Sequence, residues 1–414
     1  MTDLLLAATS LDVTPPPGHR LDGYAARTAP ATGAADPLRA TIIWLSTADD
    51  PGVLWLTLDA IAVGKQLTTE LAAAAAKVAG IPPANVVVSA SHTHSAPSGW
   101  TGQIHPVIPA EREPVLYEAL TASIANATLE RRPVTASWRS IEVIGVGTNR
   151  HRQNGPHDNT AGILALHSLE GALEAILLDF ACHPTTHGPE NLQYSADWPG
   201  AARAALAPAV VGYLQGAAGD VSPRFTRQGR GAVEVARLGG LLASRVREAL
   251  AGPGLELPQS APVIRRTTIS LPVRDLPSAD DRASAVATAE RSLRDGVDDP
   301  SARIAQTRLD GARGQALMAA ASLPETLDLP VSVVTMGDVC WVNLPVELFA
   351  LHGACLQADS THPITRVIGY TDGYYGYIVD PSAADSGAYE ALITFFDQPT
   401  TNRLLSETAA FVNS

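Results

Sequence analysis

Cysteine is scarce in this chain of 414 residues. Only Cys182, Cys340 and Cys355 occur, and no two of them stand in a Cys-x-x-Cys pair. Three scattered cysteines cannot form the disulfide framework of a small secreted protein, and without a Cys-x-x-Cys pair nothing suggests a thiolate zinc site. A bound metal would therefore take its ligands from His, Asp, Glu or Tyr.

Positive charge is scarce as well. The chain holds 29 Lys and Arg against 42 Asp and Glu, for a formal net charge of -13, and its only lysines are Lys65 and Lys77. Affinity for nucleic acid comes largely from clustered Lys and Arg. We therefore expect no nucleic-acid partner and no attraction to anionic membranes.

Long apolar runs are missing. No stretch approaches the roughly 18–20 uninterrupted apolar residues of a membrane-spanning helix, so we expect no stable membrane insertion. At the N-terminus the acidic Asp3 stands where a signal peptide has basic residues. The apolar run after it is shorter than the roughly 7–15 residues that a signal peptide needs. We expect a cytoplasmic protein.

Short β-like runs alternate with longer helical runs from one end of the chain to the other. Its length allows up to about three domains, or one large α/β domain with an insertion. The alternation predicts a mixed α/β fold, with central β-sheets flanked by helices. The predicted strands are Ala40–Leu45, Val53–Asp59, Val86–Ala90, Glu142–Gly147, Gly162–His167, Leu173–Ala181, Val210–Gln215, Val263–Leu271, Val331–Thr335, Val339–Leu344 and Arg366–Gly369.

The longer runs with helical spacing predict helices between these strands. Residues 280–321 are rich in Ala, Arg, Asp and Ser, and a break is expected at Asp298-Asp299-Pro300. This segment predicts an inserted helical hairpin with a structural role. The other predicted helices are Leu67–Ala79, Glu111–Glu130, Gly200–Leu206, Val233–Ala251 and Val346–Gln357.

Five polar clusters each follow an apolar, strand-like run. Ligand sites of sheets with helical crossovers gather at the carboxyl ends of strands, so we expect the five clusters to converge. They are Ser91–Ser95 (SHTHS), His183, Asp220–Pro223 (DVSP), Glu347, and Asp372–Tyr377 (DGYYGY) with Tyr389 further on.

The histidines and Glu347 fit a metal site. His92 and His94 stand two residues apart, so in an extended segment both can face one site. Imidazole and carboxylate hold catalytic zinc where cysteine is absent, with one position left open, and His92, His183 and Glu347 would supply such a set. Each also has an ordinary interpretation, as a hydrogen-bonded histidine or as a carboxylate favoured by the start of a helix. Spacing alone does not decide between the two.

Several motifs resemble the catalytic domain of the neutral/alkaline ceramidases, which are zinc amidases that hydrolyse N-acyl sphingosine. They occur in that family's order and extend through Pro345-Val346-Glu347, Tyr377 and Tyr389, so the resemblance covers nearly the whole chain. The most specific motifs are Leu11–Pro15 (LDVTP), Gly23–Ala25 (GYA), Ser89–Ser95 (SASHTHS) and Gly219–Pro223 (GDVSP).

The resemblance implies roles for individual residues. It implies that the zinc ligands are His92, His183, Glu347 and Tyr377. It implies that Ser222 is the essential serine, that His94 lies in the active site, and that Tyr389 is a further site tyrosine.

The chain also departs from the family pattern. Ceramidases are secreted or membrane-associated and carry a C-terminal β-sandwich domain, whereas this chain ends at Ser414, so we expect residues 1–414 to form a single catalytic domain without it. Arg224 follows Pro223 where ceramidases commonly have Asn, and the loop Pro97–Trp100 places a bulky indole near the expected site. We expect a substrate that is smaller or more soluble than ceramide.

The predicted function is hydrolysis of an amide (N-acyl) bond by a zinc-activated water. His94 could act as general acid or base. Ser222, with N–H groups of the turn 216–219, could bind the oxyanion; whether it is instead a nucleophile stays open, although no GxSxG elbow is present. Tyr389 could assist binding or charge stabilisation.

Other polar residues are candidates for supporting roles. Asp59, Asp197 and Asp220 are candidate partners of the zinc ligands, or else surface and turn-capping aspartates. Trp100 and Arg150 are candidate substrate contacts, although an ordinary salt bridge also explains Arg150. Two alternative functions stay open: a zinc hydrolase of esters, lactones or peptide bonds, and a non-catalytic binding module with a structural metal.

Overall fold

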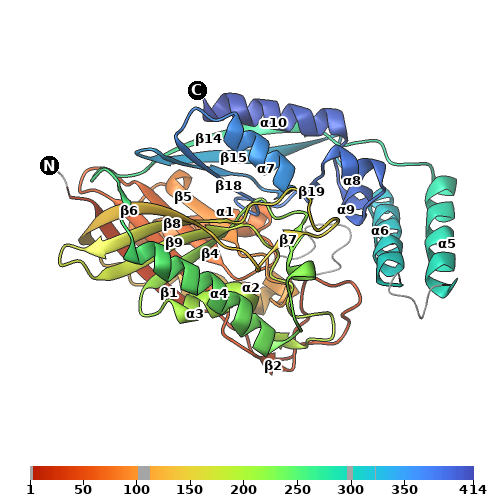
Figure 1. The fold of residues 1–414 in the computed structure, drawn as a ribbon, viewed down its shortest axis with the longest axis horizontal. Helices are drawn as coiled ribbons and strands as arrows, with labels where there is room; N and C mark the ends of the chain where they lie inside the picture. The colour runs from red at the N-terminus through yellow and green to blue at the C-terminus, as the bar shows by residue number, and fades with distance from the viewer. Residues whose placement is uncertain (1–2, 101–111, 296–301, 322) are drawn as a thin grey trace.

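The computed structural model describes residues 3–100, 112–295, 302–321 and 323–414. Helices cover the outer faces of two β-sheets, in agreement with the predicted mixed α/β fold (Figure 1). The larger sheet has the order β11 (Val210–Gln215), β9 (Leu173–Phe180), β8 (Thr160–Ser168), β6 (Arg132–Glu142), β1 (Leu5–Asp12), β3 (Arg39–Ser46), β4 (Val53–Leu58) and β5 (Val86–Ala90), with β13 (Leu255–Glu256) beside β6.

The smaller sheet has four strands. Its order is β14 (Val263–Pro272), β15 (Thr326–Met336), β16 (Val339–Asn343) and β18 (Ile364–Ile368). Three short pairs lie outside the two sheets: β2 (Gly33–Ala34) with β10 (Gln193–Tyr194), β7 (Thr148–Asn149) with β12 (Val221–Ser222), and β17 (Glu347–Leu348) with β19 (Tyr377–Ile378).

Both sheets contribute to one central apolar core. Trp341 of β16 packs against Trp55 of β4 and Trp138 of β6, with ring centroids 6.0 and 5.5 Å apart. Neighbouring residues in β4 point the other way, so Leu54 and Leu56 pack in a second cluster with the helices. Strands buried on both faces need apolar residues at successive positions, which explains their continuous apolar runs.

The outer faces of the sheets carry the helices. One half of the larger sheet packs against α1 (Lys65–Ala79) and α2 (Pro114–Ala125), and the other half against α3 (Asp197–Ala205) and α4 (Ala232–Ala251). The smaller sheet packs against α7 (Ala350–Ala358) and α10 (Gln398–Val412), as Figure 1 shows. None of the helices in the described part of the chain is long and apolar enough to cross a membrane.

Two predicted elements differ from the structure, and the strand β1 and the helix α10 were not predicted. The predicted strand Glu142–Gly147 is wrong, because β6 ends at Glu142. The sequence did not predict β6 because only Val134, Ala136 and Trp138 of it are buried and polar residues alternate with them. The predicted helix Val346–Gln357 begins only at Ala350. Glu347 therefore lies in β17 and not at the start of a helix.

The helical hairpin is present as α5 (Ala279–Asp295) and α6 (Ala302–Ala320). It projects from the body beside α8 (Pro381–Asp385) and α9 (Tyr389–Ile393), and α6 packs against α9 (Figure 1). The expected break at Asp298-Asp299-Pro300 lies outside the described residues. The hairpin thus stands next to Tyr389, one of the candidate site residues.

The ends of several strands are tied together. Isolated antiparallel bridges join Ser89 to Thr371 and Gly216 to Ile368. These bridges connect the ends of β5 and β11 in the larger sheet to the end of β18 in the smaller one. Segments far apart in the sequence, including those that follow β5, β9 and β16, therefore meet in one place.

Candidate metal centre

His92 follows β5 in a constrained backbone conformation. Its φ is 66°, a left-handed value that a residue with a side chain adopts infrequently. The Nδ1–H group donates to the carbonyl oxygen of Ile61 at 2.6 Å, and the ring lies against that of Tyr370, with centroids 4.2 Å apart. Because Nδ1 carries the proton, the lone pair of Nε2 is directed into the site.

His183 follows β9 and has the same arrangement. Its Nδ1–H group donates to the carbonyl oxygens of Ala218 and Val221, at 2.7 and 3.1 Å. The side chain is fully buried. Here too the lone pair of Nε2 faces the site, where an N–H group of Arg150 lies 3.2 Å from it.

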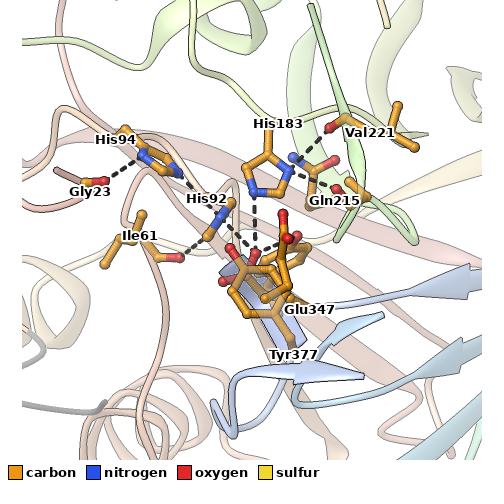
Figure 2. A network of polar contacts seen from close by, with 12 residues as sticks. Gly23, Ile61, His92, His94, His183, Gln215, Val221, Glu347 and Tyr377 are labelled. Carbon is orange, nitrogen blue, oxygen red and sulfur yellow. Dashed lines mark hydrogen bonds and ion pairs between the residues drawn. The ribbon is translucent and has the colours of Figure 1, made fainter. Parts of the chain in front are cut away.

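Glu347 is placed by a short parallel pair of strands. In that pair Glu347 of β17 is opposite Tyr377 of β19. Its Oε2 atom lies 3.2 Å from Nε2 of His92 and 3.2 Å from Nε2 of His183 (Figure 2). The hydroxyl of Tyr370 donates to Oε2 at 3.3 Å, and that of Tyr374 donates to Oε1.

His94 completes a group of three imidazoles. Its Nδ1–H group donates to the carbonyl oxygen of Gly23 at 2.9 Å, and its Nε2 lies 3.4 Å from Nε2 of His92. Gly23 has a φ of 100°, and a Cβ atom there would lie 2.5 Å from Cβ of His94, so only glycine allows this approach. One ligand atom from each of His92, His94 and His183 lies within 4.8 Å of the others.

This set of donors fits a metal ion. Each imidazole uses its own proton on a main-chain carbonyl, so the three Nε2 lone pairs and a carboxylate face one another with no imidazole proton between them. Two ligands of one tetrahedral zinc ion, each about 2.0–2.1 Å from it, lie about 3.3 Å apart. The separations of 3.2 and 3.2 Å between Glu347 and the two imidazoles agree with this value. A cation removes the repulsion within the group.

The electrostatics favour the forms of these side chains that bind metal. Burial and the charge of Arg150 lower the pKa of His183 to about 4, and burial with the neighbouring imidazoles lowers the pKa of His94 well below its ordinary value. Burial opposes ionisation of Glu347, but His92 and His183 outweigh it and hold the pKa of the carboxyl well below its usual range. Neutral imidazoles and an ionised carboxylate are the ligand forms that a metal requires.

A cavity of about 380 Å³ opens over this group. Ser222, Tyr377, Tyr389 and Arg150 line it, together with His92, His94 and Glu347. Ser222 sits in β12, which pairs with β7, and its Oγ accepts a hydrogen bond from the backbone N–H of Arg224 at 3.3 Å. The catalytic and metal-binding residues predicted from the sequence therefore meet around one cavity, with His183 buried behind it.

Arg150 connects the metal centre to α9. Its Nε–H group donates to Glu390 at 2.7 Å, while its terminal nitrogens lie 3.2 Å from Nε2 of His183 and 3.4 Å from the hydroxyl of Tyr377. The salt bridge that was an alternative explanation is therefore real, but the guanidinium also lines the cavity. Tyr377 is close enough to Arg150 for the two to act on the same bound group.

The three aspartates that were candidate partners of the zinc ligands form hydrogen bonds with other groups. Asp59 forms a bidentate ion pair with Arg203, and Asp197 accepts from the N–H groups of Thr186 and His187. Asp220 accepts from Asn149 at 2.6 Å and from the N–H of Ala350 at 2.8 Å. Main-chain carbonyls, and not these carboxylates, orient the three imidazoles. The aspartates instead stabilise the segments that carry the site.

Trp100 also differs from its expected place. Its side chain is 2% exposed and packs in the apolar cluster under α2, with Leu116 and Tyr117. Among the described residues that line the cavity, Trp100 is absent. The large apolar surface of an indole favours burial next to a helix over exposure at a polar cavity.

Several residues of the site were not singled out from the sequence. Tyr370 and Tyr374 hold Glu347, Glu390 holds Arg150, and the guanidinium of Arg27 donates to the carbonyl of His94 at 2.7 Å. The two tyrosines stand within or beside the predicted DGYYGY cluster, which was the available signal. Glu390 and Arg27 act through contacts with distant residues, which the local sequence does not reveal.

Comparison with solved structures identifies the architecture. The chain superimposes on the neutral ceramidase from Pseudomonas aeruginosa with a TM-score of 0.75 and 16% identity, covering 99% of this chain and 74% of that one. The fold is ceramidase-like. A ceramidase complexed with C2 gives a TM-score of 0.76 at 15% identity, with the same coverage. No model of a known protein family matches the chain, and no curated protein matches it in sequence. The resemblance seen in the motifs is thus confirmed for the fold.

Proposed function

We propose that this ceramidase-like chain is a zinc-dependent hydrolase of an amide bond, acting on a small N-acyl compound. One observation carries the proposal. Nε2 of His92, Nε2 of His183 and Oε2 of Glu347 converge beside a cavity, and His94, Ser222 and Arg150 face the same cavity. A purely structural metal site would not need these additional polar groups.

Zinc is the metal that this donor set suits best. Two or three imidazoles with one carboxylate and no thiolate are typical of catalytic zinc sites that keep one position open. His92, His183 and Glu347 would hold the ion, and His94 or Tyr377 stands close to the same point. When bound, zinc supplies Lewis acidity and lowers the pKa of a water in the open position.

The residues of the chain supply the remaining chemistry. Nε2 of His94, with its lone pair toward the cavity, accepts a proton from the attacking water and returns it to the leaving nitrogen. Arg150 and the hydroxyl of Tyr377 donate toward the oxygen of the scissile carbonyl as negative charge develops on it. Such a preorganised donor contributes about 3–4 kcal/mol to stabilisation of the transition state.

Two further groups complete this wall of the cavity. Ser222 offers a hydroxyl to the same oxygen, and its hydrogen bond from the N–H of Arg224 fixes the position of Oγ. Tyr389 packs edge-on against Tyr377, with ring centroids 6.3 Å apart, and orients it. The mechanism therefore assigns Ser222 as a donor and not as the nucleophile.

Metal removal tests this function directly. The protein is treated with a chelator, reloaded with zinc, and assayed on a matched panel of hexanoyl amides and hexanoyl esters. We expect hydrolysis to vanish without metal and to return with zinc, and the amides to be preferred by kcat/KM. A preference for the esters would favour the alternative function, and activity that survives chelation would exclude both.

Variants separate the metal centre from the rest of the fold. We expect His92→Ala and His183→Ala to reduce both zinc content and kcat/KM by more than about a hundredfold. His362→Ala, a histidine remote from the cavity lining, is the matched control and should change neither quantity. Equal effects of all three substitutions would contradict the assignment of the ligands.

A further inference from the structure

The mouth of the cavity carries positive charge, although the protein as a whole is acidic. Arg224, which follows the Ser222 turn, and Arg308 of α6 both line the cavity and are exposed. They come from segments more than eighty residues apart and stand in the wall of the same cavity as the metal centre. The pair forms a local positive patch in a chain with a formal net charge of -13.

No carboxylate in the described part of the protein forms an ion pair with either of these two arginines. Among its ion pairs none involves Arg224 or Arg308. The guanidinium of Arg224 donates to a main-chain oxygen, that of Arg150, at 3.1 Å, which leaves its other N–H groups available. Arg150, by contrast, is already paired with Glu390 and is committed to the metal centre.

The acidic residues of the cavity lining are mostly occupied. Glu347 belongs to the metal centre, and Glu390 is paired with Arg150. Asp310 of α6 remains, and it accepts a hydrogen bond from Gln306 at 2.8 Å. Arg227, which is half-buried, also lines the cavity, so the arginines outnumber this remaining carboxylate and give the mouth a net positive charge that suits an anionic ligand.

We propose that the substrate of this hydrolase is an amide that also carries a carboxylate, as an N-acyl amino acid does, and that Arg224 and Arg308 bind this carboxylate. The inference rests on the proposed function for the position of the scissile bond. A guanidinium pairs well with either carboxylate or phosphate. A phosphate is the alternative anion, and the binding experiment below includes a phosphate ester to distinguish the two.

The helical hairpin of α5 and α6 contributes to substrate binding if this proposal is correct. It was expected to be structural, but Thr307, Arg308 and Asp310 of α6 line the cavity. Since α6 packs against α9, the helix that carries Tyr389 and Glu390, it holds Arg308 in a fixed relation to the metal centre. The hairpin is therefore a specificity element for the end of the substrate away from the scissile bond.

Binding of two ketones that cannot be hydrolysed tests the proposal without relying on turnover. In 4-oxononanoate a methylene replaces the amide nitrogen of hexanoylglycine. Its neutral counterpart is 1-hydroxynonan-4-one, in which a hydroxymethyl group replaces the carboxylate. Calorimetry on the zinc-loaded protein should give a Kd about tenfold or more lower for the anionic ketone, because hydrogen bonds between charged groups are roughly twice as strong as neutral ones.

Variants of the two arginines then show whether these side chains bind the carboxylate. We expect Arg224→Gln combined with Arg308→Gln to bring the two Kd values within about threefold of each other, with the neutral ketone bound as before. Arg308→Lys, which keeps the charge, should retain part of the preference. Arg313→Gln is the control, because Arg313 lies on the same helix but pairs with Glu290 outside the cavity lining.

The outcomes distinguish this proposal from the proposed function. Equal Kd values for the two ketones in the unchanged protein, or a preference that survives in the double variant, would overturn carboxylate recognition by these arginines. Tighter binding of the phosphate ester of 1-hydroxynonan-4-one would show that the anion is a phosphate instead. Failure to hydrolyse hexanoylglycine and hexanoylethanolamine, with the ketone preference intact, would overturn the hydrolase and leave the anion site standing.

Discussion

Glu390 sets the position and charge of Arg150. Burial raises the free energy of an ionised carboxylate, but the charge of Arg150 outweighs burial and lowers the pKa of Glu390 to about 2. Burial likewise opposes the charge on Arg150, and Glu390 outweighs it and raises the pKa of Arg150 well above its ordinary value. Both groups therefore stay charged at neutral pH, with Arg150 held between His183 and Tyr377.

Removing the charge of Glu390 tests this role. We expect Glu390→Gln to lower kcat/KM for the amide substrate about 10–100-fold, because Arg150 loses the partner that orients it. Breaking a buried ion pair costs about 3–5 kcal/mol of stability. Glu407→Gln, which breaks the exposed Arg403 pair in α10, should leave activity unchanged and cost under about 1 kcal/mol. Glu390→Gln protein with unchanged kinetics would contradict the positioning role.

The same carboxyl predicts a dependence of stability on pH. Its folded pKa of about 2 lies below the ordinary value of 4.5, so its contribution is fully present above about pH 4.5 and is lost as pH falls toward 2. A difference of this size corresponds to about 3 kcal/mol. Urea unfolding of the unchanged protein and of Glu390→Gln should show a stability difference that shrinks as pH falls from 6 to 3. A difference that stays constant with pH would contradict the assigned pKa.

At the scale of elements, two adjacent glycines in α4 should respond in opposite ways to alanine. A Cβ atom at Gly239 would lie 2.6–2.7 Å from atoms of α3, including the backbone of Trp198 and Ala202, whereas a Cβ at Gly240 meets nothing within 4 Å. We expect Gly239→Ala to cost about 1–3 kcal/mol through overpacking, and Gly240→Ala to gain about 0.5–1 kcal/mol from helix propensity. Thermal unfolding of both variants measures this, and a similar shift in the two would contradict the close contact between α3 and α4.

The elements also show what the sequence could and could not predict. The continuous apolar runs of β5 and β11 predicted both strands with their observed bounds, because strands buried on both faces have a strong local signal. The strand β17 could not be predicted, because it is two residues long and exists only through pairing with β19, thirty residues further on. The contact of α6 with the cavity likewise depends on packing against α9.

Some residues of the site could likewise be predicted from the sequence, and others could not. His92, His94 and Glu347 follow apolar runs and share motifs with ceramidases, so the sequence predicted that they would meet. Trp100 was assigned to the substrate on proximity in sequence alone, and burial among apolar side chains decided its place instead. The hydrogen-bond partners of the histidines are carbonyl oxygens, which every residue has, so no pattern of side chains could have identified them.

At the scale of the whole molecule, the site exists because two sheets meet. His92 and His183 belong to segments that follow strands of the larger sheet, whereas Glu347, Tyr370 and Tyr377 belong to segments that follow strands of the smaller one. The core around Trp341 holds the sheets together. A metal ion bound by residues from both sheets would therefore stabilise the folded protein as well as the site, since a ligand that binds only the folded state raises its stability.

We propose that His92, His183 and Glu347 bind a catalytic zinc ion beside the cavity. Anomalous diffraction from crystals of the purified protein, recorded on both sides of the zinc absorption edge, tests it most directly. We expect one strong anomalous peak at coordination distance, about 2.0–2.2 Å, from Nε2 of both histidines and from an oxygen of Glu347. A zinc-loaded crystal with no peak at this point, or with the peak at other side chains, would contradict the account.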